Sequence, residues 1–257
     1  MSSGATPKIS IVTAIYNREK SVKSLCNSFS TQTYSNKEHI IVDGGSNDGT
    51  LRLLEEYSHK FGCYLISEPD EGIYDAINKG VRLATGEIIG LLHSDDLFAN
   101  PNILELVAKE FLDPTLDAIY GDAVFFDAKN SSKFIRKYSS RRFSLKSIAW
   151  GWIPAHTTLF VRRRVFEKHG MYKTNYKIAG DVEFISRIFT SEGFRSKYIP
   201  VILVRMGIGG ISTAGLKNTI LLNIEMMRAL KESGVKTNFF KILSRYPLKM
   251  LEFFNFK

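Results

Sequence analysis

The sequence predicts an α/β fold in which a mostly parallel, Rossmann-like sheet is flanked by helices. In the N-terminal half, short apolar runs alternate with helical stretches, an order typical of right-handed strand–helix–strand units. Polar, mostly acidic clusters follow these runs, at the strand ends where parallel sheets bind ligands. The chain has 257 residues, 44% of them hydrophobic and 24% charged, so it can bury a full core.

The expected strands of this half are apolar and rich in β-branched residues, as in sheets that are buried on both faces. They are Ile9–Tyr16, His39–Val42, Cys63–Ser67 and Ile88–Leu92. Helices are expected over residues 21–31, from Thr50 to about Lys60, over residues 73–84, and from about Pro101, where proline suits a first helical turn.

The C-terminal half is less regular. Strands are expected at 118–120 and 123–126, on either side of Gly121-Asp122, and at Thr157–Val161, with helices over 181–192 and 216–232. Lys133–Lys146 holds six basic residues and no acidic one, which predicts a mobile basic loop. The predicted organisation is one globular domain over residues 1–212 and a basic, amphipathic helical appendage over residues 213–257.

The formal charge of +9 favours an anionic partner, which could be a sugar nucleotide, membrane lipid or nucleic acid. Cys26 and Cys63 are too few and too far apart for a disulfide framework or a cysteine metal site, so a reducing compartment is expected. No apolar run approaches the ~20 residues that span a bilayer, and the N-terminus lacks a signal-peptide pattern. These features predict a cytoplasmic protein and leave open peripheral contact with the inner face of the membrane.

Asp95 and Asp96 are adjacent carboxylates at the end of the fourth expected strand. Such a pair resists burial unless a cation or hydrogen-bond donors compensate it. Mg²⁺ and Mn²⁺ bind carboxylate oxygens and share their other positions with substrate phosphates, so a metal clamp for a nucleotide diphosphate is one interpretation. The other is a solvated loop in which an aspartate caps the following helix.

Several motifs stand in one order along the chain. They are Asn17 after the first strand, Val42-Asp43-Gly44-Gly45-Ser46-Asn47-Asp48-Gly49-Thr50, Glu68 through Gly80, Gly86-Glu87, Ser94-Asp95-Asp96 and Ala179-Gly180-Asp181. Over about residues 7–212 the chain resembles the family-2 glycosyltransferases of bacterial polysaccharide assembly, especially colanic-acid-type members. The resemblance implies a GT-A fold, a nucleotide-diphospho-sugar donor, a divalent metal (Mn²⁺ or Mg²⁺) and inversion at the anomeric carbon.

The resemblance also implies roles for residues at the strand ends. Asp43 would hydrogen-bond the donor base, with Thr13 and the backbone after the first strand, at Asn17, lining the same pocket. Asp95 would lie near the ribose, and Asp96 would ligate the metal. Since Asp-Gly-Gly is also strong turn chemistry, Asp43 has a turn interpretation as well.

Three further residues are expected on the donor side. Asp75 and Lys79 are four residues apart on an expected helix, so they share one polar edge, and Lys79 could offset diphosphate charge. A solvated helix face explains Lys79 equally well. Arg205 lies near a loop, Gly209-Gly210-Ile211-Ser212, that resembles a family loop closing near the donor, and it could meet phosphate.

Asp181 occupies the position at which the family carries its general base. A carboxylate at a helix start is also ordinary capping and dipole chemistry, which is the alternative. Glu183, two residues later, should point elsewhere on the helix and is a weaker candidate.

Three residues are weaker candidates for the acceptor side. Asp122 follows Tyr120-Gly121 and could instead be a turn residue, and His156 could be a satisfied interior histidine. Trp152 could stack on a sugar ring, although core packing is the commoner use of tryptophan. The expected acceptor is a saccharide or a lipid-linked saccharide.

The tail Val235–Lys257 mixes aromatic residues with lysines and arginines. Such a segment suits an anionic membrane surface, and packing onto the domain or an oligomer contact is the alternative. Two rival functions remain: a sugar nucleotidyltransferase, although no glycine- and arginine-rich triphosphate loop follows Ile9–Tyr16, and a non-catalytic basic module. Carboxylates at the strand ends repel anionic polymers, so no nucleic acid partner is expected.

Overall fold

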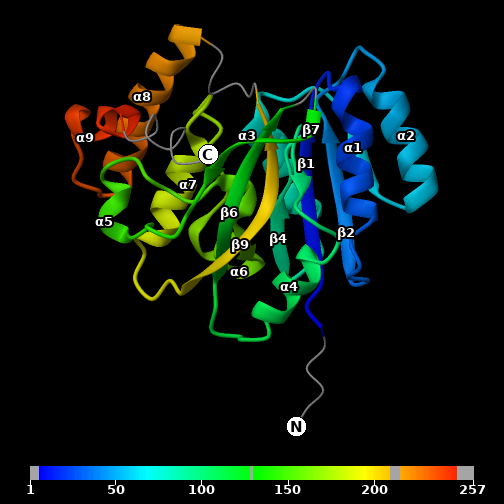
Figure 1. Ribbon diagram of the computed structural model, residues 1–257, viewed down its shortest axis with the longest axis horizontal. Coiled ribbons are helices and arrows are strands. Elements are labelled where there is room, and N and C mark those ends of the chain that lie inside the picture. The colour runs from blue at the N-terminus through cyan, green and yellow to red at the C-terminus, as the bar shows by residue number, and fades with distance from the viewer. Residues whose placement is uncertain (1–5, 128–129, 209–214, 248–257) are drawn as a thin grey trace.

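The computed structural model describes residues 6–127, 130–208 and 215–247 and is built on one nine-stranded sheet (Figure 1). The strand order is β3-β2-β1-β4-β8-β6-β9-β5, and β7 pairs with β6. The strands are β1 Ile9–Ile15, β2 Lys37–Asp43, β3 Tyr64–Ser67, β4 Ile88–Leu91, β5 Leu97–Phe98, β6 Ala118–Asp127, β7 Asn130–Tyr138, β8 Phe160–Arg162 and β9 Ser196–Gly207.

Strands β3, β2, β1 and β4 are all parallel, so their carboxyl ends share one edge of the sheet. Ile15 lies opposite Asp43, and Val12 lies opposite Leu91. Beyond β4 the sheet is mixed, because β8 is antiparallel to both β4 and β6 while β6 and β9 are parallel. The predicted α/β class is confirmed, and the fully parallel pairing belongs to its N-terminal half.

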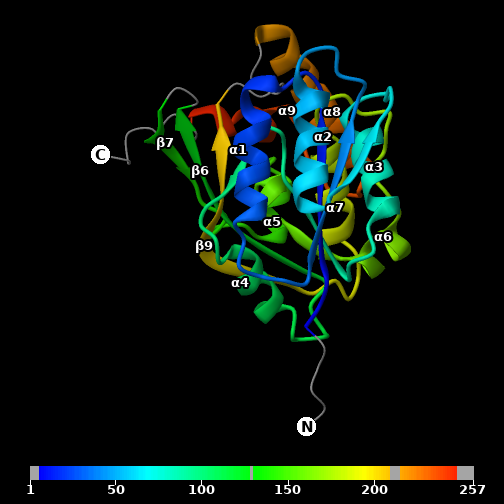
Figure 2. The same cartoon turned by 90° about the vertical axis from the view of Figure 1, so that its right-hand side faces the viewer.

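Helices cover both faces of the sheet (Figure 2). They are α1 Glu19–Ser30, α2 Thr50–Phe61, α3 Ile73–Leu83, α4 Ile103–Glu110, α5 Leu145–Ile148, α6 Arg163–His169, α7 Gly180–Phe189, α8 Gly215–Glu232 and α9 Phe239–Leu243, with a 3₁₀ turn at His156–Thr158. Alternate residues of β1 face opposite sides: Ile11 joins the core beneath α1, α2 and α4, and Val12 joins the core with α3, α6 and α7.

The C-terminal half differs from the expectation. One strand, β6, replaces the two expected around Asp122, with shifts of register at that point. Expected strand 157–161 is a 3₁₀ turn followed by β8, and β9 was not expected as a whole. The prediction of a basic loop was wrong for the residues up to Tyr138, because they belong to strand β7. The guanidinium of Arg136 lies 4.5 Å from the centre of the Phe125 ring, and this cation–π contact stabilises a positive charge within the strand.

The C-terminal helices pack onto the sheet domain. Met226, Ala229 and Leu230 of α8 are buried in the same core as Phe184 of α7, and Ile242 of α9 is fully buried there too. The predicted boundary after residue 212 lies outside the described residues and stays a prediction. None of the described helices is long and apolar enough to cross a bilayer.

Candidate active site

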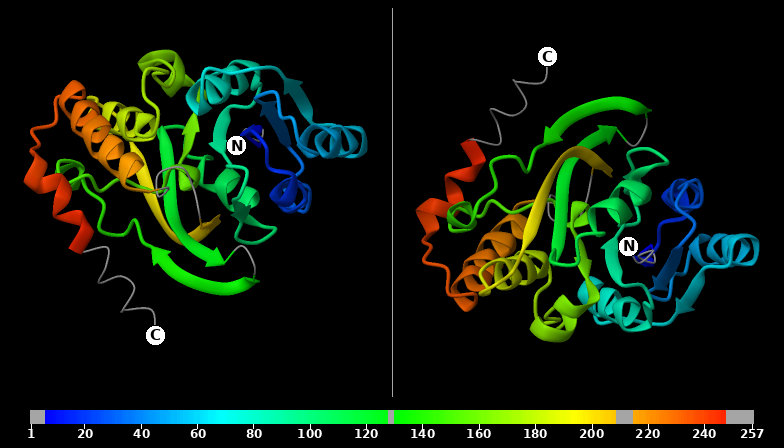
Figure 3. Two further views of the ribbon diagram at one scale, coloured as in Figure 1. Left: turned by 90° about the horizontal axis from the view of Figure 1, so that it is seen from above. Right: turned by 90° about the horizontal axis from the view of Figure 1, so that it is seen from below.

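The predicted site residues gather mainly at the carboxyl edge of the parallel strands, which Figure 3 shows from above. Asp43, the last residue of β2, is fully buried. Its carboxylate accepts hydrogen bonds from the Ser46 N–H at 3.0 Å and the Ser67 hydroxyl at 2.6 Å, and also from the Ser46 hydroxyl. These bonds shape the turn after β2, so the turn interpretation holds, and contact with a donor base stays a prediction.

Asn17 connects the end of β1 to that turn. Its backbone has a positive φ of 50°, which asparagine tolerates better than most residues. The Asn17 N–H donates to the Ser46 hydroxyl at 2.8 Å, and its side-chain oxygen accepts from the Asn47 N–H at 2.9 Å. Asn17 and Asp43 therefore belong to one hydrogen-bonded unit.

Thr13 does not reach this edge. It lies inside β1 and is fully buried, and its hydroxyl is 3.0 Å from Nε2 of the buried His39. The expectation that Thr13 lines the donor pocket is therefore corrected: the strand continues for two more residues before it ends, and the side chain stays in the interior.

Asp75 and Lys79 lie on α3 at the same edge and contact each other. The Lys79 ammonium is 3.3 Å from Asp75 and 2.8 Å from Glu68, and it donates to the Pro69 carbonyl at 2.9 Å. Lys79 therefore ties the loop before α3 to that helix, and a contact with diphosphate stays a prediction.

Asp96 carries a buried carboxylate without full compensation. The residue is 2% exposed, and its Oδ2 has no hydrogen-bond partner among the residues that the structure describes. Burial, and then the neighbouring charge of Asp95, raise the Asp96 pKa well above its ordinary value. Asp95 is half-buried, and its carbonyl accepts from the Gly207 N–H of β9 at 3.1 Å.

This pair fits a hard divalent cation that takes most of its ligands from elsewhere. Within the described ranges, no group of three or more His, Cys, Asp or Glu side chains could hold a metal. A Mg²⁺ or Mn²⁺ ion bound through one or two carboxylates and completed by phosphate oxygens and water needs no such group. The orphaned Oδ2 of Asp96 is the oxygen that such an ion would satisfy.

Arg205 lies on β9 opposite Leu97, the residue after Asp96. Its guanidinium is 5.2 Å from the ring centre of Phe126 and 5.5 Å from that of Phe134, within the range of cation–π contacts. The aromatic rings of β6 and β7 therefore hold this cation on the strand that pairs with β5, which begins directly after Asp96. Its contact with phosphate stays a prediction.

Asp181 lies in the first turn of α7 and is partly exposed. Burial is the largest cause that raises its pKa, to about 6, against the lowering effects of nearby N–H donors, the Arg245 charge and the Tyr74 hydroxyl. Its Oδ1 accepts from the Val182 N–H at 2.8 Å. A carboxylate with a pKa near the working pH can accept a proton, so the geometry suits a general base.

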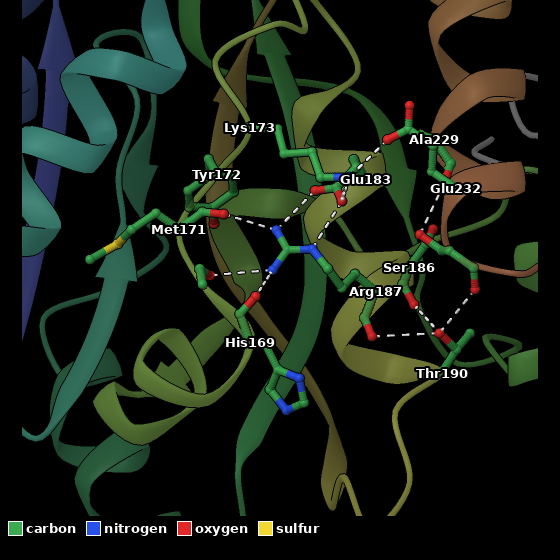
Figure 4. A network of polar contacts seen from close by, with 12 residues as sticks. His169, Met171, Tyr172, Lys173, Glu183, Ser186, Arg187, Thr190, Ala229 and Glu232 are labelled. Carbon is green, nitrogen blue, oxygen red and sulfur yellow. Dashed lines mark hydrogen bonds and ion pairs between the residues drawn. The ribbon is translucent and has the colours of Figure 1, made fainter.

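Glu183 is not available to a substrate. It is 1% exposed, and its two oxygens lie 2.9 Å from Nε and Nη2 of Arg187 (Figure 4). The Lys173 ammonium is also 2.9 Å from Glu183. Through Arg187, which donates to the Met171 carbonyl at 2.9 Å, this network fastens α7 to the segment after α6.

The three acceptor candidates come from different segments of the C-terminal half. Asp122 is 1% exposed; it pairs with Lys137 at 2.8 Å and accepts from Tyr198 at 2.9 Å, beside a pocket of about 650 Å³. Buried His156 is 2.8 Å from the Tyr172 hydroxyl, and burial followed by the His93 charge holds its pKa well below the ordinary value. This favours the interior-histidine interpretation. Trp152 is half-buried after α5.

Sequence reasoning missed four residues of this region: Tyr74, His93, Glu225 and Arg245. Tyr74 stands inside a recognised motif, and its hydroxyl accepts from the Asp181 N–H at 3.2 Å. His93 lies next to the acidic pair, with its ring centre 5.5 Å from that of His156. Glu225 and Arg245 come from the C-terminal helices, where the motif order offered no signal.

Sequence comparisons identify relatives of the chain. A family profile described as "Glycosyl transferase family 2" matches residues 10–185. The "PGL/p-HBAD biosynthesis glycosyltransferase" of Mycobacterium bovis is 31% identical over 222 residues, which are 84% of this chain and 82% of that protein. Glycosyltransferase AglE of Haloferax volcanii is 27% identical over 186 residues, which are 70% of this chain and 61% of that protein.

Solved structures share the fold. The mannosyltransferase PcManGT from Pyrobaculum calidifontis, in complex with GDP-Man and Mn²⁺, matches with a TM-score of 0.68 and 21% identity, covering 94% of this chain and 69% of that one. TarS 1-349 of S. aureus, in complex with UDP, matches with a TM-score of 0.63 and 18% identity, covering 87% and 72%. At these low sequence identities, the two matches show that the chain shares their fold.

Glu183→Gln should destabilise the protein, because a neutral amide leaves Arg187 and Lys173 without their shared buried counter-charge. We expect a loss of about 3 kcal/mol in the free energy of unfolding, as is typical when one member of a buried ion pair is removed. Urea denaturation measures it. The exposed Glu192 is the control, and Glu192→Gln should change stability little; equal stability of the two variants would contradict a structural role for Glu183.

Proposed function

Because the chain belongs to glycosyltransferase family 2 and has the GT-A fold, we propose that it moves a sugar from a nucleotide-diphospho-sugar to an acceptor hydroxyl with inversion at the anomeric carbon. The acceptor is a saccharide or lipid-linked saccharide of bacterial surface polysaccharide assembly. The observation that carries the proposal is the combination of the buried Asp96 carboxylate, whose Oδ2 has no hydrogen-bond partner among the described residues, and the raised-pKa carboxylate of Asp181.

On the donor side, Asp43 and Asn17 would hold the base and Asp95 would lie near the ribose. Asp75, Lys79 and Arg205 would face the diphosphate and sugar. Asp96 would hold Mn²⁺ or Mg²⁺, and such an ion, when bound, neutralises charge that develops on the diphosphate leaving group. The ligands bound in structures with a similar fold, GDP-Man with Mn²⁺ and UDP, support a donor of this class.

On the acceptor side, Asp181 would accept the proton of the attacking hydroxyl. The acceptor oxygen forms a bond to the anomeric carbon while the bond from that carbon to the diphosphate oxygen breaks, through an oxocarbenium-like transition state. The electron pair of the broken bond leaves with the nucleoside diphosphate, and the proton stays on Asp181. Asp122, His156 and Trp152 are weaker candidates for contacts with the acceptor.

The rival functions lose support. A sugar nucleotidyltransferase needs a triphosphate loop after β1, where this chain instead has Asn17 bonded to the next turn. A non-catalytic basic module would have no use for a buried carboxylate such as Asp96, one oxygen of which has no hydrogen-bond partner in the described part of the chain. The family membership also favours transfer.

We also propose that the protein works in the cytoplasm as a peripheral protein on an anionic membrane. Leu216, Ile220 and Ile224 are 82%, 60% and 54% exposed and recur every fourth residue, so they form an apolar stripe on α8. Lys217 and Lys231 are exposed on the same helix. An apolar stripe flanked by lysines is typical of helices that lie in an anionic bilayer surface, where a lipid-linked acceptor would be found.

Asp96→Asn should weaken metal-dependent nucleotide binding by at least about tenfold, because it removes a charged oxygen ligand and keeps the side-chain shape. Calorimetric titration of UDP and GDP, with and without MnCl₂, measures the effect. Asp48→Asn, at an exposed residue of the turn after β2, is the control and should bind normally. If Asp96→Asn keeps the full Mn²⁺-dependent affinity for the nucleotide, Asp96 is not a ligand of the metal.

Asp181→Asn should lower turnover by about 10²–10⁴-fold and leave nucleotide affinity nearly unchanged. The wild-type rate should rise with pH through about 6, because only the deprotonated carboxylate can accept a proton. Release of UDP or GDP from UDP-glucose, UDP-N-acetylglucosamine and GDP-mannose, with water as acceptor, measures both effects. Near-normal turnover in Asp181→Asn would show that Asp181 only caps the helix, since asparagine caps almost as well as aspartate.

The triple substitution Leu216→Ser, Ile220→Ser, Ile224→Ser should reduce co-sedimentation with vesicles that contain phosphatidylglycerol. It is a cleaner test than removal of Val235–Lys257, which would also delete the buried Ile242 and Arg245. Phe61→Ser with Tyr64→Ser, which removes two exposed rings elsewhere on the surface, is the matched control. Equal sedimentation of both variants, or binding insensitive to added salt, would argue against the membrane surface.

A further inference from the structure

The backbone just before the proposed base is held by one glutamate of a distant helix. Glu225 of α8 is 5% exposed, and its carboxylate accepts three hydrogen bonds from consecutive N–H groups. The donors are Lys177 at 2.8 Å on one oxygen, and Ile178 at 2.8 Å and Ala179 at 2.9 Å on the other. Bonds to a charged acceptor are stronger than neutral ones, so this contact fixes the segment firmly.

Tyr74 of α3 holds the same segment at two further atoms. Its hydroxyl donates to the Ile178 carbonyl at 2.6 Å and accepts from the Asp181 N–H at 3.2 Å. Its ring fills the space above Gly180, where an added Cβ would lie 2.7 Å from ring carbons. The backbone of residues 177–181 is thus held by α3 and α8, and Gly180 is the residue that allows the ring to approach.

We propose that Glu225 is a positioning residue for Asp181: it acts through residues 177–179 to set where the base meets the acceptor hydroxyl. This inference rests on the proposed function. A general base must lie within hydrogen-bond reach of its proton, and a misplacement of about 1 Å can lower the rate about 10²-fold. Glu225 accepts a hydrogen bond from Ala179, which caps the start of α7 and lies two residues before Asp181.

The chemistry of the contact requires a carboxylate. Three N–H donors need three acceptor sites, which the two oxygens of a glutamate supply. In a glutamine, the amide nitrogen would face at least one of these N–H groups and repel it. Glu225 makes no ion pair among the described residues, so its charge is balanced by this segment of backbone.

The same contact should influence the proton affinity of the base. Burial is the main cause of the raised Asp181 pKa, and the charged or titratable groups that interact with Asp181 are Arg245, which follows α9, Tyr74 of α3 and Tyr172. A loosened segment would admit water to the carboxylate and lower its pKa toward the ordinary value. A residue that only stabilised the fold would leave the acid limb of the pH profile in place.

Glu225→Gln should lower kcat by about 10–100-fold, change the donor KM less than about twofold, and move the acid limb of kcat to lower pH. UDP or GDP release from the three nucleotide sugars, with water as acceptor, measures all three quantities. Glu232→Gln is the matched control, because Glu232 lies on the same helix and its carboxylate pairs with Lys173 at 2.8 Å. Glu232→Gln should keep the wild-type kcat and pH profile, even if its melting temperature falls as much as that of Glu225→Gln.

A double-mutant cycle separates positioning from simple stabilisation. If Glu225 acts through Asp181, Glu225→Gln should change kcat less than about twofold once Asp181→Asn is present. The same loss in both backgrounds, or an unmoved acid limb, would overturn the positioning role and leave the proposed function intact. Near-normal turnover of Asp181→Asn alone would instead overturn the proposed base and, with it, this inference. If Glu225→Gln does not fold, Glu225→Asp, which keeps the charge but shortens the side chain, takes its place.

Discussion

The parallel pairing of β1 with β2 on one side and β4 on the other is the constraint on which the rest of the site depends. All seven residues of β1 are buried, so a slip of one residue would turn its apolar side chains to the wrong faces. This register aligns the end of β1 with Asp43 and brings the end of β4, and Asp95-Asp96 after it, to the same edge. Residues far apart in the chain meet there because three strands end together.

Much of the N-terminal half was predictable, because β1, β4 and most of β2 are buried apolar strands and helices alternate with the strands. The C-terminal half was not. β7 is a basic strand that pairs with β6 through contacts such as Arg136 on Phe125, which composition does not reveal. β9 contains Pro200 and pairs with β6 through shifts of register, and its apolar run Val201–Val204 covers only the middle of the strand. The sequence therefore does not mark its whole length.

The candidate site divides in the same way. The order of motifs led to Asp96, Asp181 and Asp43, which the structure finds at strand and helix ends. It failed for Thr13, because a motif does not say whether a strand residue faces a ligand or the interior. Glu183 and Asp181 are both acidic residues at the start of α7, and only packing separates a carboxylate between two cations from one that is partly exposed. Glu225 was beyond prediction, since its partners are in a different part of the chain.

Because α8 carries Glu225, the smallest part of this protein that could be active must extend beyond residue 185 and include that helix. The family profile ends at residue 185, after every strand-end carboxylate and the proposed base. A fragment cut there would keep the reactive groups and lose β9, which braces Asp95, and α8, which braces residues 177–179. The carboxylates proposed to react and part of the scaffold that positions them therefore lie in different stretches of the chain. Exchanging C-terminal segments between relatives would therefore replace the residues that position the proposed base, together with the surface of those segments.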